Sequence, residues 1–104
     1  MIDLQSKYLD EVKAILDRFV PHCEVRVFGS RVKGNVKPFS DLDLAIVGKT
    51  ALDFQTVARL KEAFSDSDLP IIVDIVDFHK ISDNFKKIIE TQYEVIQKNT
   101  KTEA

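Results

Sequence analysis

The stretch that decides the fold spans residues 24–48 and reads EVRVFGSRVKGNVKPFSDLDLAIVG. Its first five residues alternate polar and apolar side chains and are rich in β-branched types, which predicts a strand that ends at Gly29. Residues 41–47 form a second apolar run with acidic residues at its start, which predicts another strand. Gly34 and Pro38 indicate turns between the two strands.

Three helices are predicted outside this stretch. Apolar side chains recur at three- and four-residue steps in residues 3–19 and again in residues 53–64, with charged residues on the opposite faces. Ser82 or Asp83 is expected to cap a last helix. The residues expected to face the core from the second helix are Phe54, Val57, Ala58, Leu60 and Phe64. Those expected to face it from the last helix are Phe85, Ile88, Ile89, Tyr93 and Ile96.

A third strand is predicted over residues 71–76, which are strongly β-branched. The order of elements is then α-β-β-α-β-α, which is typical of an α+β (α/β) fold in which helices pack on a small mixed sheet. No linker, repeat or low-complexity segment divides the chain, so residues 1–104 are expected to form one domain. A polar tail over about 98–104 is expected to fray.

The composition is that of an ordinary globular protein, with 44% hydrophobic and 31% charged residues in a chain of 104. Fifteen basic and 17 acidic residues give a net charge of −2, which argues against general nucleic-acid binding because such proteins carry a basic excess. No apolar run approaches the roughly 20 residues of a membrane span, so a cytoplasmic protein is expected. The single cysteine, Cys23, is expected to be a small, half-buried hydrophobic residue.

Asp41 and Asp43 stand two residues apart on a predicted strand. Their side chains therefore share one face, with Cα atoms roughly 6–7 Å apart. Two adjacent like charges raise each other's pKa, and a divalent cation would remove the conflict. Oxygen ligands favour Mg²⁺ or Mn²⁺ over zinc. The alternative is that the pair belongs to a turn or to a solvated strand end, where aspartate is common.

Asp74 interrupts the third β-branched run. If this strand pairs beside the second, Asp74 can join the same cluster, and three carboxylates on adjacent strands are a usual frame for two-metal phosphoryl transfer. Asp77 competes for this role, but it lies three residues further on and should face the other way, at the strand exit.

Gly29 and Ser30 form a turn at the end of the first strand. A turn of this kind exposes backbone N–H groups that can bind an anion, and the Ser30 hydroxyl can donate to a phosphate oxygen. Arg31 and Lys33 can neutralise the charge of a triphosphate. The spacing differs from that of a Walker A loop.

The combination of Gly29-Ser30, ten residues and then Asp41-x-Asp43 resembles the signature of the nucleotidyltransferase (DNA polymerase β-like) superfamily. The fuller string resembles the minimal nucleotidyltransferase family, small domains that often act as antitoxins beside HEPN-domain toxins. The resemblance implies that Asp41 and Asp43 are ligands of two Mg²⁺ ions, and that Asp74 holds the ion near the acceptor hydroxyl and helps to activate it.

By the same resemblance, Gly29 and Ser30 contact the β- and γ-phosphates, while Arg31 and Lys33 stand at the family's basic positions. The implied reaction is transfer of a nucleoside monophosphate, AMP from ATP, to a hydroxyl group, with a tyrosine of the HEPN toxin as the implied acceptor. A partner subunit or a second copy of the chain is expected to complete the cleft.

Two alternative functions stay open from the sequence. The domain could neutralise its partner by contact alone, or it could modify a small molecule as antibiotic nucleotidyltransferases do. His22 and His79 are interpreted as surface or loop residues, and the aromatic side chains as core residues.

Overall fold

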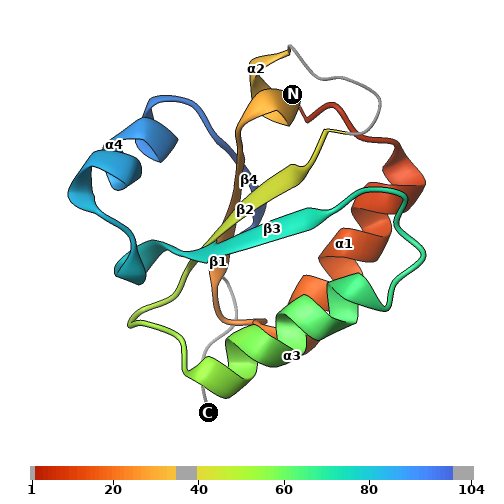
Figure 1. The fold of residues 1–104 in the computed structure, drawn as a ribbon, viewed down its shortest axis with the longest axis horizontal. Coiled ribbons are helices and arrows are strands. Elements are labelled where there is room, and N and C mark those ends of the chain that lie inside the picture. The colour runs from red at the N-terminus through yellow and green to blue at the C-terminus, as the bar shows by residue number, and fades with distance from the viewer. Residues whose placement is uncertain (1, 35–39, 100–104) are drawn as a thin grey trace.

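Four strands form one twisted sheet in the order β3-β2-β1-β4 in the computed structural model, which describes residues 2–34 and 40–99. β1 pairs antiparallel with both β2 and β4, and β2 pairs parallel with β3, so the sheet is mixed as predicted. The strands are β1 (Glu24–Phe28), β2 (Leu42–Val47), β3 (Val73–Asp77) and β4 (Glu94–Gln97). β3 and β4 are the two edges of the sheet (Figure 1).

Two long helices cover one face of the sheet and a shorter helix lies on the other (Figure 1). α1 and α3 pack against each other, and their buried residues join alternate residues of β1 and β2 in one core. α4 lies across the opposite face, which carries the side chains of Arg26, Phe28, Asp43 and Asp74 and is called here the α4 face. The helices are α1 (Ser6–Phe19), α2 (Ser30–Lys33), α3 (Phe54–Ser65) and α4 (Asp83–Thr91), with a 3-10 turn η1 (Phe78–Lys80) after β3.

The core lies between the sheet and the pair α1 and α3. Its strand residues alternate along β1 and β2, because successive side chains of a strand point to opposite faces. Burial of one such aliphatic side chain contributes about 1.5–3 kcal/mol. The residues with no exposed surface are Val12, Leu16, Val25, Val27, Leu42, Leu44, Ala45, Ile46, Leu60 and Ile89. Cys23 is also buried, more completely than predicted.

Side-chain caps fix where α3 and α4 begin. The Asp53 carboxylate accepts the amide of Thr56 at 2.7 Å, and the Ser82 hydroxyl accepts the amide of Phe85 at 3.1 Å. Each cap satisfies a donor that has no partner within its helix. The predicted cap at Ser82 is therefore confirmed.

The C-terminal segment differs from the prediction of one helix reaching Ile96. α4 ends at Thr91, Gln92 is extended, and residues 94–97 form β4 on the free edge of β1. Tyr93 and Ile96 therefore do not lie on a helix, and Tyr93 stacks on the Arg26 guanidinium instead. Backbone pairing with β1 outweighs the helical spacing of these apolar residues.

Three other residues predicted to face the core are exposed, namely Phe54, Ala58 and Ile88. The Phe54 side chain is 83% exposed at the start of α3, and Ile88 is 58% exposed on α4. β3 runs from Val73 to Asp77, two residues later than its predicted start and one later than its predicted end. The turn predicted at Pro38 and the last residues of the polar tail lie outside the described residues. None of the helices in the described ranges is long and apolar enough to cross a membrane.

Candidate active site

The three aspartates singled out in the sequence meet at one end of the α4 face. Asp43 and Asp74 are directly paired across the parallel strands β2 and β3. Asp41 immediately precedes β2 and, being two residues from Asp43, lies on the same side of the chain. The carboxyl groups of Asp41 and Asp74 are hydrogen-bonded to each other. The structure thus brings Asp74 together with two carboxyl groups, of Asp41 and Asp43, that lie about thirty residues earlier in the sequence.

Close packing of these carboxyl groups disfavours their charged forms. Burial raises the pKa of Asp43, and the charges of Asp74 and Asp41 raise it further. The pKa of Asp74 is also raised, by desolvation and by the hydrogen bond and charge of Asp41, while Lys61 on α3 opposes the shift. Because Asp74 is exposed to solvent, desolvation of its carboxyl group is limited. We therefore attribute its raised pKa more specifically to the neighbouring carboxyl group of Asp41. This end of the sheet therefore concentrates negative charge that a cation would relieve.

The donor set suits a hard divalent cation, since it consists of carboxylate oxygens on two adjacent strands. Within residues 2–34 and 40–99, however, no three acidic, histidine or cysteine side chains form a finished metal site. The hydrogen bond between Asp41 and Asp74 holds two of the candidate ligands against each other instead. A cation that bound both groups would have to come between them.

Gly29 brings the backbone of the predicted phosphate turn directly against this cluster. Its φ of 82° is one that residues with a side chain rarely adopt. A Cβ atom at this position would lie 2.3 Å from Oδ2 of Asp43, which is far too close for any side chain. Phe28 pairs with Asp43 across β1 and β2, so the end of β1 delivers the turn to the carboxylate. The glycine is required by both conformation and contact.

Ser30 begins the short helix α2 that follows this glycine. The amides of Val32 and Lys33 donate to the Gly29 carbonyl, while the preceding amides lie ahead of the helical hydrogen-bond ladder. This is the geometry expected of an anion-binding turn. Lys33 lies exposed at the far end of α2. The phosphate contacts of Gly29, Ser30 and Lys33 stay predictions.

Arg31 occupies a buried position, with only 7% of its surface exposed. Its Nη2 donates to the Ser40 carbonyl at 2.9 Å, and its Nη1 donates to the Asp3 carbonyl at 2.6 Å. The Asp3 amide donates back to the Arg31 carbonyl. Arg31 therefore ties the N-terminal segment to Ser40, the residue that precedes Asp41. In this conformation the guanidinium holds the site together, and its predicted contact with phosphate stays a prediction.

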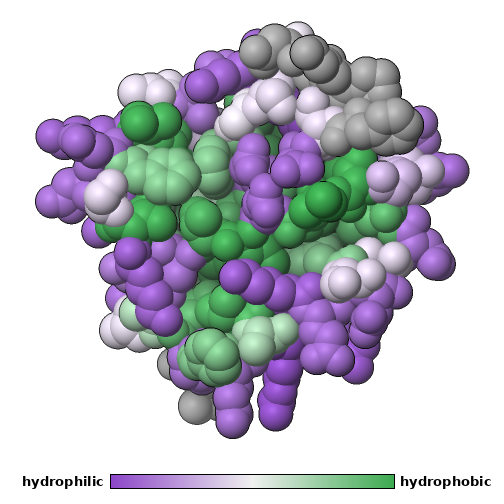
Figure 2. Space-filling view, in the orientation of Figure 1, coloured by the Kyte–Doolittle hydropathy of each residue, from purple (hydrophilic) through white to green (hydrophobic). Residues whose placement is uncertain are grey.

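Two contacts that were not predicted from the sequence link α4 and the residue after it to the site. The Phe85 ring packs edge-on against Phe28, with 5.7 Å between ring centroids. The Gln92 side chain donates to the Val32 carbonyl in α2 at 3.3 Å. The aromatic character of Phe28 and Phe85 could have suggested their contact. Nothing in the sequence around Gln92 indicates its hydrogen bond to Val32. Figure 2 shows hydrophobic side chains over α4 and in the middle of the view, where β3 lies in front, with hydrophilic groups among them.

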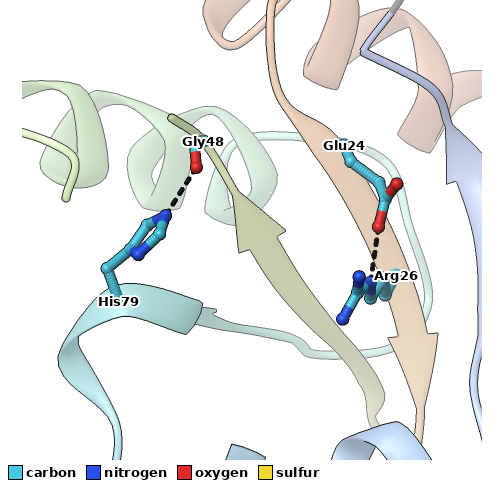
Figure 3. A network of polar contacts seen from close by, with 4 residues as sticks. All are labelled: Glu24, Arg26, Gly48 and His79. Carbon is cyan, nitrogen blue, oxygen red and sulfur yellow. Dashed lines mark hydrogen bonds and ion pairs between the residues drawn. The ribbon is translucent and has the colours of Figure 1, made fainter. Parts of the chain in front are cut away.

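The opposite end of the sheet is fixed by a separate set of polar contacts. The Asp77 carboxylate is buried and accepts the amides of Leu52 at 2.7 Å and His79 at 3.0 Å. Figure 3 shows the His79 ring against the Gly48 carbonyl at the end of β2. It also shows the ion pair of Arg26 with Glu24 on β1. His79 and Asp77 thus have structural contacts, and Asp77 faces away from Asp74 as predicted.

Comparison with known proteins agrees with this geometry. Residues 10–102 match the family described as polymerase beta, nucleotidyltransferase. The chain belongs to this nucleotidyltransferase family. A Haemophilus influenzae protein named "Probable protein adenylyltransferase MntA" is 52% identical over 101 residues, which are 97% of this chain and 89% of the relative. The family and enzyme class predicted from the sequence are therefore confirmed.

Solved structures with the same fold include other small nucleotidyltransferases. A minimal nucleotidyltransferase is 28% identical with a TM-score of 0.66, over 85% of this chain and 91% of that one. A toxin–antitoxin structure with AMP-PNP is 25% identical with a TM-score of 0.72, over 85% and 71% of the chains. At 24% identity and a TM-score of 0.63, over 89% and 71% of the chains, the complex of a tri-AMPylated Shewanella oneidensis HEPN toxin with an MNT antitoxin shares the fold.

Proposed function

We propose that this nucleotidyltransferase transfers AMP from ATP to a hydroxyl group of a HEPN-domain toxin, most simply a tyrosine, and so acts as its antitoxin. The observation that carries the proposal is the meeting of Asp41, Asp43 and Asp74 with the backbone of Gly29 at one end of the sheet. The name of the 52% identical relative supports protein adenylylation as the reaction.

In this proposal, Asp41, Asp43 and Asp74 hold two Mg²⁺ ions, or Mn²⁺ in their place, because carboxylate oxygens are the ligands that these cations prefer. When bound, the ions supply positive charge that stabilises the attacking and leaving oxygens of the phosphoryl transfer. The amide of Gly29 and the amide and hydroxyl of Ser30 donate to the β- and γ-phosphates and orient the pyrophosphate for departure.

Asp74 is the carboxylate that receives the proton of the acceptor hydroxyl. Its side chain is exposed, so an acceptor hydroxyl group can approach it from solvent. Lys33 stays near the phosphate turn as a source of positive charge. Arg31 acts through Ser40 to hold the approach to Asp41 in place.

The HEPN partner is proposed from the structures that share this fold. One is a complex of an AMPylated HEPN toxin with its MNT antitoxin, and another is a toxin–antitoxin with a non-hydrolysable ATP analogue. With ATP as the donor, we propose that the reaction takes place in the cytoplasm. The proposed complex contains this chain and the toxin, and additional copies of either are open.

Incubation with α-labelled ATP, Mg²⁺ and a HEPN-domain protein that binds this chain tests the proposal. We expect label on the toxin, and its loss in the double variant Asp41→Asn and Asp43→Asn. The control is Asp68→Asn, which removes an exposed carboxylate from the loop before β3. An unlabelled toxin that is still neutralised would favour inhibition by contact, and label on an aminoglycoside-type alcohol alone would favour a small-molecule enzyme.

A further inference from the structure

The outer edge of β3 presents backbone groups beside Asp74. Among the described residues, β3 pairs with β2 alone. The Ile72 carbonyl accepts the Leu42 amide on the inner edge. Successive residues of a strand direct their N–H and C=O groups to opposite edges. Since those of Ile72 point inward, the N–H and C=O groups of Val73 and Ile75 point outward. An edge of this kind can pair with a strand from another protein.

Two cavities lie along this edge, and Lys61 of α3 lines both of them. The first has a volume of about 360 Å³ and includes Leu69, Pro70, Ile72 and Val73 in its lining. The second has a volume of about 330 Å³ and includes Phe54, Val57, Val76 and Ile81. The second cavity is largely apolar, whereas polar and apolar atoms line the first about equally, and Lys61 borders both.

The most exposed large hydrophobic side chains of the described residues border these two cavities. Phe54 is 83% exposed at the second cavity, and Ile72 is 65% exposed at the first. A single exposed apolar residue is ordinary, but Phe54 at the start of α3 and Ile72 just before β3 each lie beside a cavity along the same edge of the sheet. Lys61 stands between them and is close enough to Asp74 for its charge to act on that carboxylate.

We propose that the outer edge of β3, with Phe54, Lys61 and Ile72, binds an extended segment of the acceptor protein and delivers its hydroxyl group to Asp74. The segment carries apolar side chains for the two cavities and an acidic residue beside Lys61, because opposite charges favour and orient such an encounter. This docking surface rests on the proposed function, since it names the route by which the protein acceptor reaches the site.

The other edge of the sheet gives a natural comparison. β4 also has an outer edge, and Val95 on it is 39% exposed. β4 is separated from β3 by both β1 and β2, so a segment bound there would lie across the sheet from Asp74. Only the β3 edge places a bound strand next to the carboxylate that receives the proton.

Charge substitutions on the surface test the proposal against a matched residue elsewhere. Phe54→Asp, Ile72→Asp and Lys61→Glu are each expected to weaken binding of the HEPN-domain partner about tenfold or more. Ile88→Asp on α4 alters a residue of similar exposure (58%) and is expected to change binding less than twofold. Calorimetric titration measures the affinity in the Asp41→Asn, Asp43→Asn background, and circular dichroism checks that each variant folds.

Hydrogen exchange of the complex tests the extended pairing itself. The outward-pointing amides of Val73 and Ile75 are expected to gain protection when the partner binds, whereas the amides of residues 94–97 are not. Wild-type affinity in all three edge variants, an equal loss in Ile88→Asp, or protection confined to residues 94–97 would overturn the docking surface. Label transfer separates the two proposals: labelling that survives the edge variants contradicts only the docking surface, and binding at this edge without labelling contradicts only the transferase activity.

Discussion

Asp74 and Asp77 lie three residues apart on one strand and have opposite surroundings. Asp74 is exposed on the α4 face, where it meets Asp41 and Asp43 and its pKa is raised by desolvation and by Asp41. Asp77 is buried on the other side and accepts two backbone amides. Strand alternation therefore separates a carboxylate suited to chemistry from one that holds the fold together.

The largest expected effect is the loss of catalysis when Asp74 is replaced. Asp74→Asn is expected to slow labelling of the toxin by about 10²–10⁴-fold, because it removes both a proposed proton acceptor and a proposed cation ligand. Single-turnover transfer from α-labelled ATP measures this rate. A rate within threefold of the wild type would contradict the role given to Asp74.

Asp77→Ala is expected to act on stability instead. It leaves the amides of Leu52 and His79 without their charged acceptor, and a hydrogen bond to a charged group contributes about 1.5–3 kcal/mol. Urea denaturation is expected to show a free energy of unfolding lower by roughly that amount or more. The labelling rate per folded molecule should stay near that of the wild type, and a large specific loss would contradict the division between the two aspartates.

Alanine substitution of two glycines separates the effect of the close contact with Asp43 from the effect of backbone strain. Gly29→Ala combines a φ of 82° with a clash against Asp43, whereas Gly34 has a φ of 89° and open space where a Cβ would lie. Strain of this kind costs about 1–3 kcal/mol at either position. Labelling is expected to be lost in Gly29→Ala and retained in Gly34→Ala. Equal losses of labelling in these two variants would contradict the contact between Gly29 and Asp43.

The smallest expected effect is the stability gained when the carboxylate cluster loses one charge. The pKa of Asp74 in the folded protein lies above its ordinary value of 3.8, so its ionised form costs stability at neutral pH. Without divalent cations, Asp74→Asn is expected to raise the free energy of unfolding by about 0.2–1 kcal/mol at pH 7. This increase in the free energy of unfolding should vanish as the pH falls towards 3.8. Asp68→Asn should show no such increase.

The sequence was sufficient for the parts of the site that depend on local periodicity. Spacing of two residues placed Asp41 and Asp43 on one side, and the β-branched run around Asp74 predicted that this residue lies on a strand, while the pairing of that strand with β2 stayed a condition. The turn at Gly29 was visible because glycine ends a β-branched segment. Each of these signals depends on residues within a few positions of one another.

Contacts between distant segments could not be predicted in the same way. Arg31 reaches the carbonyls of Asp3 and Ser40, and a basic residue beside a phosphate turn gives no sign of those partners. Residues 94–97 were predicted as helix because Ile89, Tyr93 and Ile96 keep helical spacing, whereas the structure places them in β4. Its pairing with β1 is a property of the assembled sheet.

The central claim is that the carboxylate cluster transfers AMP to a hydroxyl group of the toxin. Mass spectrometry of the HEPN-domain partner, after incubation with this protein, ATP and Mg²⁺, tests it most directly. The account predicts an AMP adduct that peptide mapping places on a tyrosine, and its absence when Asp41 and Asp43 are both replaced by asparagine. An unmodified partner, or an adduct that persists in the double variant, would contradict it.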